Sequence, residues 1–72
     1  MEQAEQYVAR ALVLAPDNAE AFLERGIIRQ LRGNSAGARR DWERAVSLSP
    51  DGPTADLALQ NLALNEAGPQ RR

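Results

Sequence analysis

Apolar side chains recur every three or four residues along much of this chain, and this spacing is typical of amphipathic helices. The first such segment spans residues 2–15, where one helical face carries Ala4, Val8, Ala11, Leu12 and Ala15. Pro16 ends this helix, because a residue that precedes a proline avoids the helical backbone conformation.

The residues between the apolar segments predict where the next helices begin and end. Asp17 is expected to cap the second helix, because Glu20 follows it at the spacing of a capping box. Gly33 suits the left-handed backbone position that often follows a helix. Asn34 or Ser35 then opens the third helix.

The third helix is expected to end before Pro50, as the first ends before Pro16. Pro53 fits the first turn of a fourth helix, which ends near Ala67. Loops of a few residues between helices of about 14 residues make neighbouring helices antiparallel. The predicted fold class is therefore all-α, built from antiparallel helical hairpins, with a disordered tail at residues 68–72.

The chain repeats itself at an offset of 34 residues. This offset relates Ala4 to Ala38, Ala11 to Ala45, Leu14 to Leu48 and Pro16 to Pro50. Residues 19–52 resemble a tetratricopeptide repeat, for which this period is the signature. They carry its aromatic, small and proline positions as Phe22, Gly26, Ala38, Trp42, Ala45 and Pro50. The small residues let two helices approach closely, and the aromatic rings fill the space beside them.

The resemblance implies a short right-handed solenoid of four helices, in a single domain over residues 1–67. Within that domain, residues 1–18 would be a half repeat, 19–52 a complete repeat and 53–67 a terminal helix. The terminal helix diverges most from the family pattern, as the ends of solenoids often do.

Two arginines depart from the family pattern, since Arg25 and Arg29 stand where a leucine and a tyrosine are usual. Together with Arg32 they form a stripe along the second helix. Three interpretations are open for this stripe. The side-chain stems cover apolar surface while the head groups reach water, or Arg29 stacks on Trp42 or another aromatic ring, or the stripe binds an anion.

The composition narrows the functions that this chain can carry. With 72 residues it forms one small domain at most, and it contains neither cysteine nor histidine. Disulfides and thiolate metal sites are thereby excluded, and the commonest metal ligand and general base is missing. No hydroxyl group can pair with a histidine, and no glycine-rich phosphate loop is present. We therefore expect no enzyme, no metal and no cofactor.

Charge and hydropathy limit the partners further. Nine basic and ten acidic residues leave no positive field that would attract nucleic acid or an anionic membrane. No apolar run approaches the roughly 20 residues of a membrane span. The polar, acidic N-terminal sequence does not resemble a signal peptide. We expect a cytoplasmic protein with neither a nucleic-acid partner nor a membrane partner.

The resemblance implies that partners bind a concave groove lined by the first helix of each repeat. The groove-facing positions would be Glu20, Leu23, Ile27, Gln30, Leu31, Leu57, Asn61, Leu64 and Asn65. The leucines and the isoleucine would be apolar anchors, with the polar residues at the rim. Family members that clamp acidic chaperone peptides carry lysine and asparagine where this chain has Leu23 and Ile27, so no carboxylate clamp is expected.

Two functions follow from this surface. The first is a protein–protein interaction module, a scaffold or adaptor that binds a peptide or helix through the apolar groove. The second is a structural self-assembly unit, a homo-oligomer in which the unpaired first and last helices of neighbouring copies pack together. A structural alternative is that the apolar groove residues only complete a small core.

Overall fold

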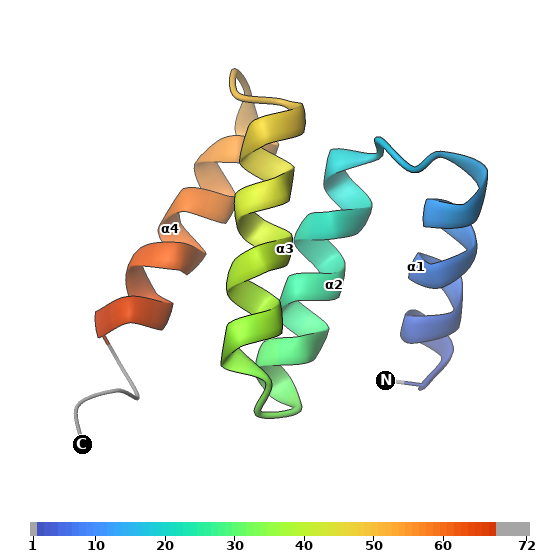
Figure 1. Ribbon diagram of the computed structural model, residues 1–72, viewed down its shortest axis with the longest axis horizontal. Coiled ribbons are helices and arrows are strands. Elements are labelled where there is room, and N and C mark those ends of the chain that lie inside the picture. The colour runs from blue at the N-terminus through green and yellow to red at the C-terminus, as the bar shows by residue number, and fades with distance from the viewer. Residues whose placement is uncertain (1, 68–72) are drawn as a thin grey trace.

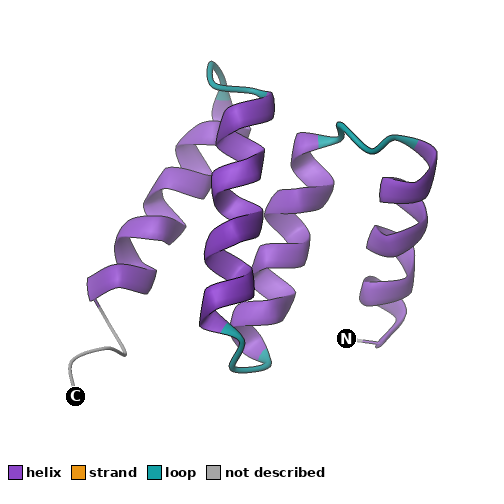
Figure 2. Cartoon of the chain, viewed as in Figure 1, coloured by secondary structure: helices purple, strands orange, loops and turns teal. Residues whose placement is uncertain are grey.

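The computed structural model describes residues 2–67, with side chains as far as Asn65 (Figure 1). It contains four helices, which are Glu2–Leu14 (α1), Ala19–Leu31 (α2), Ser35–Leu48 (α3) and Pro53–Ala67 (α4). Every regular element in this described part is a helix, and short loops connect them (Figure 2). The all-α prediction is confirmed, whereas the right-handed sense and the repeat boundaries stay predictions. The predicted disordered tail lies outside the described residues.

An asparagine, one residue later than predicted, caps α2. Asn18 Oδ1 accepts a hydrogen bond from the backbone nitrogen of Ala21 at 3.1 Å, so the assignment of Asp17 as the cap is wrong. The backbone nitrogen of Asn18 donates to the Ala15 carbonyl at 3.0 Å, and this tight turn places Asp17 before the helix start. Glu20 becomes the second helical residue, too early for a capping box.

The turn between α2 and α3 follows the prediction closely. Gly33 has a φ of 86°, the left-handed conformation that favours glycine. The backbone nitrogens of Gly33 and Asn34 donate to the carbonyls of Gln30 and Arg29, which satisfies the end of α2. Asn34 Oδ1 then accepts from the backbone nitrogen of Gly37 at 2.9 Å and caps α3. The two helices are thereby held as an antiparallel hairpin.

Trp42 is the centre of the core that α2, α3 and α4 share. It is only 3% exposed, and its indole Nε1 donates to the Leu23 carbonyl at 3.2 Å. The buried residues of this cluster are Leu23, Ala38, Trp42, Ala45 and Ala58. Gly26 lets α2 approach the indole, because a β-carbon at this position would lie 2.3 Å from Nε1. The small and aromatic positions of the repeat therefore serve the packing role predicted for them.

The terminal helices are packed less completely than the central hairpin. Among the described helices α1 contacts only α2, through a cluster of Val8, Ala21 and Ile28. Helix α4 contacts α3 and α2 and buries Ala55 and Ala58. Leu59 of α4 is exposed, because no further helix of the described chain covers that side of α4.

An ionic cluster joins α2 to α3 where the family pattern has apolar residues. Arg25 donates two hydrogen bonds to the Asp41 carboxylate, both at 3.0 Å, and Arg29 Nη1 lies 3.3 Å from Asp41 Oδ2. The guanidinium of Arg25 also lies 5.3 Å from the centre of the Phe22 ring. The head groups of Arg25 and Arg29 thus pair with the buried carboxylate of Asp41 rather than reaching water alone. Within the stripe it is Arg25, not Arg29, that contacts an aromatic ring. Asp41 was not recognised as their partner from the sequence.

Candidate interaction surface

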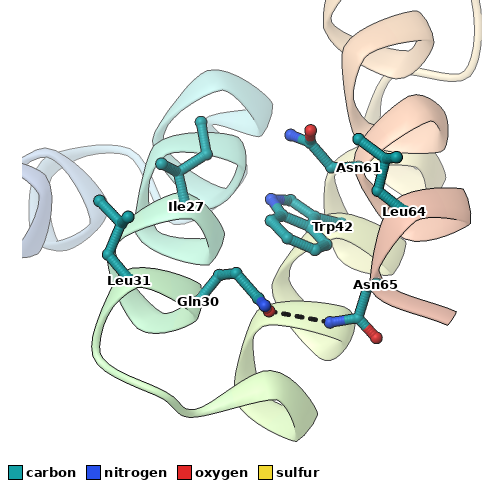
Figure 3. Close-up of a pocket in the computed structure, with 7 residues that line it drawn as sticks. All are labelled: Ile27, Gln30, Leu31, Trp42, Asn61, Leu64 and Asn65. Carbon is teal, nitrogen blue, oxygen red and sulfur yellow. Dashed lines mark hydrogen bonds between the residues drawn. The ribbon is translucent and has the colours of Figure 1, made fainter. Parts of the chain in front are cut away.

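A pocket of about 190 Å³ opens between α2 and α4, above the core (Figure 3). Helix α2 contributes three side chains to it, α3 contributes one and α4 three. They are Ile27, Gln30, Leu31, Trp42, Asn61, Leu64 and Asn65. The volume is below the roughly 300–1,000 Å³ of small-molecule sites. The pocket is therefore better suited to one side chain of a partner than to a cofactor.

Six of the nine residues predicted for the groove line this pocket. Leu23 does not, because it points into the core and is buried against Trp42. Glu20 and Leu57 are exposed on the same two helices but lie outside the pocket lining. Whether these positions bind a partner stays a prediction.

Trp42 is the lining residue that the sequence analysis assigned only to the core. Its position in the repeat pattern, between Ala38 and Ala45, marks the contact between helices. One part of the indole fills that contact, and another part forms a wall of the pocket between Ile27 and Leu64 (Figure 3). The only feature of the sequence that could have indicated both roles of Trp42, in the core and in the pocket wall, is its position as a large aromatic residue between two small ones.

Asn65 joins the three helices around the pocket, although it was expected at the rim. It is only 5% exposed, so that expectation is wrong. Asn65 Nδ2 donates to Gln30 Oε1 at 3.0 Å and to the backbone carbonyl of Ser35 at 3.3 Å. The physical reason for the difference is that α4 packs beside the start of α3, so that the Ser35 carbonyl of α3 and the Gln30 side chain of α2 both accept from the amide.

The pocket is electrically neutral at its lining. None of its seven residues carries an ionisable side chain, and the exposed apolar carbons come from Ile27, Leu31 and Leu64. The polar groups are the amides of Gln30, Asn61 and Asn65. Such a surface offers apolar contact and neutral hydrogen bonds but no countercharge, so a charged group placed inside would lose its hydration without compensation.

A second pocket, of about 320 Å³, lies between α1 and α2. Its lining consists of Ala4, Tyr7, Val8, Glu24, Ile27 and Ile28. Ile27 of α2 contributes to the lining of both pockets. No helix among residues 2–67 combines the length and apolarity that crossing a bilayer requires. The same residues contain no group of three side chains suited to hold a metal ion.

Comparison with known protein families shows to which family this chain of helical hairpins belongs. The sequence pattern of the tetratricopeptide repeat family matches residues 1–63, which is most of the chain. The chain belongs to the tetratricopeptide repeat family. Tetratricopeptide repeats are generally non-catalytic modules that bind other proteins.

Two mouse proteins contain stretches similar to this tetratricopeptide repeat chain. Protein O-mannosyl-transferase TMTC1 of Mus musculus is 42% identical over 59 residues, which are 82% of this chain and 6% of that protein. Tetratricopeptide repeat protein 36 of Mus musculus is 50% identical over 40 residues, which are 56% of this chain and 22% of that protein. The chain thus spans less than a quarter of the length of either relative. No solved structure matched it.

Proposed function

We propose that this chain is a non-catalytic protein-interaction module that binds an uncharged apolar peptide segment in the pocket between α2 and α4. The observation that carries the proposal is the exposure of Ile27, Leu31 and Leu64 around the edge of Trp42. Solvated apolar side chains gathered around a pocket are characteristic of a binding surface. Membership of the tetratricopeptide repeat family supports the same role, and a cytoplasmic location is part of the proposal.

A titration with a neutral peptide tests this function. The probe is the blocked tripeptide N-acetyl-Gly-Leu-Gly-amide, which has one apolar side chain and no charge. We expect it to change the fluorescence of Trp42, the only tryptophan, because that indole lines the pocket. We expect Leu64→Asp to weaken binding at least tenfold, since it removes apolar area and places a charge at the pocket.

Val13→Asp is the matched control for Leu64→Asp. Val13 is 78% exposed and Leu64 is 70% exposed, so neither change should disturb folding, and Val13 lines neither pocket. Equal affinities of the two variants for the probe would contradict the proposed site. Far-ultraviolet circular dichroism of both variants shows whether the helices are intact.

A second function, self-association, is favoured by exposed apolar residues at matching repeat positions. Tyr7 lies 34 residues before Asp41, and Leu59 lies 34 residues after Arg25. Asp41 and Arg25 pair across the α2–α3 hairpin. If α4 of one copy packed on α1 of another in the same way, Leu59 would meet Tyr7. These residues are 51% and 72% exposed, and such packing would bury both.

Light scattering over a range of protein concentrations tests this second function. We expect the average mass to rise with concentration in the parent chain and to stay that of a monomer in Leu59→Arg. Adding Tyr7→Asp to that variant is expected to restore association, because the two changes reproduce the Arg25–Asp41 pair between copies. A parent chain that is monomeric at every concentration would refute self-association and leave peptide binding unaffected.

A further inference from the structure

The hydrogen bonds around Asn65 determine which atoms the pocket offers to a partner. The backbone carbonyl of Ser35 can only accept a hydrogen bond, so the side-chain atom of Asn65 that faces it must be the amide nitrogen. That nitrogen carries two hydrogens, and the second is donated to Gln30 at 3.0 Å. The atom of Gln30 that faces Asn65 must therefore be its carbonyl oxygen, Oε1.

The other end of the Gln30 amide is thereby fixed as a donor. Gln30 uses Oε1 in its hydrogen bond with Asn65, so Nε2 takes no part in that bond. Gln30 is also one of the residues that line the pocket. Within the described residues Nε2 makes no hydrogen bond, and no buried side-chain nitrogen or oxygen lacks a partner. Nε2 is therefore accessible to a partner, with two N–H groups and no acceptor.

We propose that a peptide segment occupies this pocket and places a backbone carbonyl at Gln30 Nε2. Gln30 is the directional hydrogen-bond donor of the pocket, and Asn65 is the residue that positions it. The apolar side chain of the same segment lies against Trp42, Ile27 and Leu64. The inference rests on the proposed function, because it names the groups by which the partner of that site is recognised.

The neutrality of the lining selects a peptide carbonyl over other acceptors. A carboxylate or a phosphate also accepts from an amide, but no cation lines the pocket to replace the water that such an anion loses. An ammonium or guanidinium group has no acceptor to offer Gln30. Asn61, which makes no hydrogen bond within the described residues, carries both a donor and an acceptor and can serve the adjacent peptide group.

The test removes the donor of Gln30 in two ways. Gln30→Glu keeps an oxygen for Asn65 to donate to but has no N–H, and Gln30→Met removes both groups at similar length. We expect Gln30→Met to bind N-acetyl-Gly-Leu-Gly-amide about fivefold more weakly, which corresponds to ~1 kcal/mol for one neutral hydrogen bond. Gln30→Glu is expected to lose more, because its carboxylate faces the carbonyl of the peptide.

Gln60→Glu is the matched control, because Gln60 is exposed on α4 and lines neither pocket. It makes the same chemical change as Gln30→Glu and should bind the probe as the parent chain does. In the parent chain we expect the probe to move the Nε2 proton resonances of Gln30 downfield. In Asn65→Ala, where the amide is no longer oriented, this shift should be lost even if the helices remain folded.

The outcomes separate this inference from the function on which it rests. Binding of the probe by both Gln30 variants within twofold of the parent, with no movement of the Nε2 protons, would overturn the inference while Trp42 still reports an occupied pocket. No response of Trp42 up to the solubility limit of the probe would overturn the proposed function and the inference together. An N-acetylglycine carboxylate that binds more tightly than the neutral probe would overturn the inference as well.

Discussion

Trp42→Ala is expected to lower the free energy of unfolding by about 3–5 kcal/mol. The indole fills the space between α2, α3 and α4, so the change leaves a cavity in the core and removes the hydrogen bond from Nε1 to the Leu23 carbonyl. A domain of this length has a total unfolding free energy of about 4–11 kcal/mol. The loss is therefore a large fraction of the total, and it unfolds the domain if the total lies at the lower end of that range. Urea denaturation followed by far-ultraviolet circular dichroism measures the loss.

Gly26→Ala provides the control for this prediction. In the parent chain its β-carbon would lie 2.3 Å from Nε1 of Trp42, so the indole or the helix must shift and stability should fall. In the background of Trp42→Ala the obstacle is gone, and the better helix propensity of alanine should make the same change neutral or stabilising. Independent, additive effects of the two changes would contradict this account of the contact.

The combined variant Arg25→Leu, Arg29→Leu is expected to be destabilised by about 3–5 kcal/mol. It leaves the carboxylate of Asp41 buried at the α2–α3 contact without either cation, and the side chain of Asp41 is only 4% exposed. Thermal or urea unfolding at neutral pH gives the measurement. The side chains of Arg25 and Arg29 are about one third exposed, so water can reach Asp41 beside the new leucines. Such hydration of the carboxylate places the expected loss of stability at the lower end of the range.

Adding Asp41→Leu to that variant should recover most of the lost stability. An apolar trio of similar volume often matches or exceeds a buried ionic cluster, since no charge then has to leave water. The control variant Arg39→Leu, Arg40→Leu removes two exposed arginines for which the described residues show no ion pair, and it should change stability little. A similar loss in the control would mean that net charge, rather than the Asp41 cluster, determines the effect.

Much of the architecture could be predicted because it depends on local spacing. Helices follow from apolar residues at intervals of three and four, and the turn at Gly33 needs a residue that tolerates positive φ. The resemblance to a tetratricopeptide repeat indicated which side chains pack between helices, and Trp42 with Gly26 behaves accordingly. The cap of α2 was misplaced by one residue, because Asp17 and Asn18 are both good capping residues and only the turn geometry distinguishes them.

The sequence predicted which positions of the helices belong to the candidate site, but not which of their side chains are exposed there and which are buried. Periodicity places Ile27, Leu31 and Leu64 on matching faces of their helices, and they do line one pocket. It does not say that Leu23, one turn earlier on α2, is covered by Trp42. That depends on the distance between α2 and α3, which the absence of a side chain at Gly26 makes small.

The sequence by itself determined the helices, the hairpin order and the family of this protein, because each depends on residues close together or related by one constant offset. Only the tertiary structure decided the partners of its polar groups. Asp41 meets Arg25 across a helix contact, and Asn65 meets Gln30 from a helix 35 residues away. Such pairings depend on how closely one helix packs against the next, which the spacing of residues along the chain does not encode.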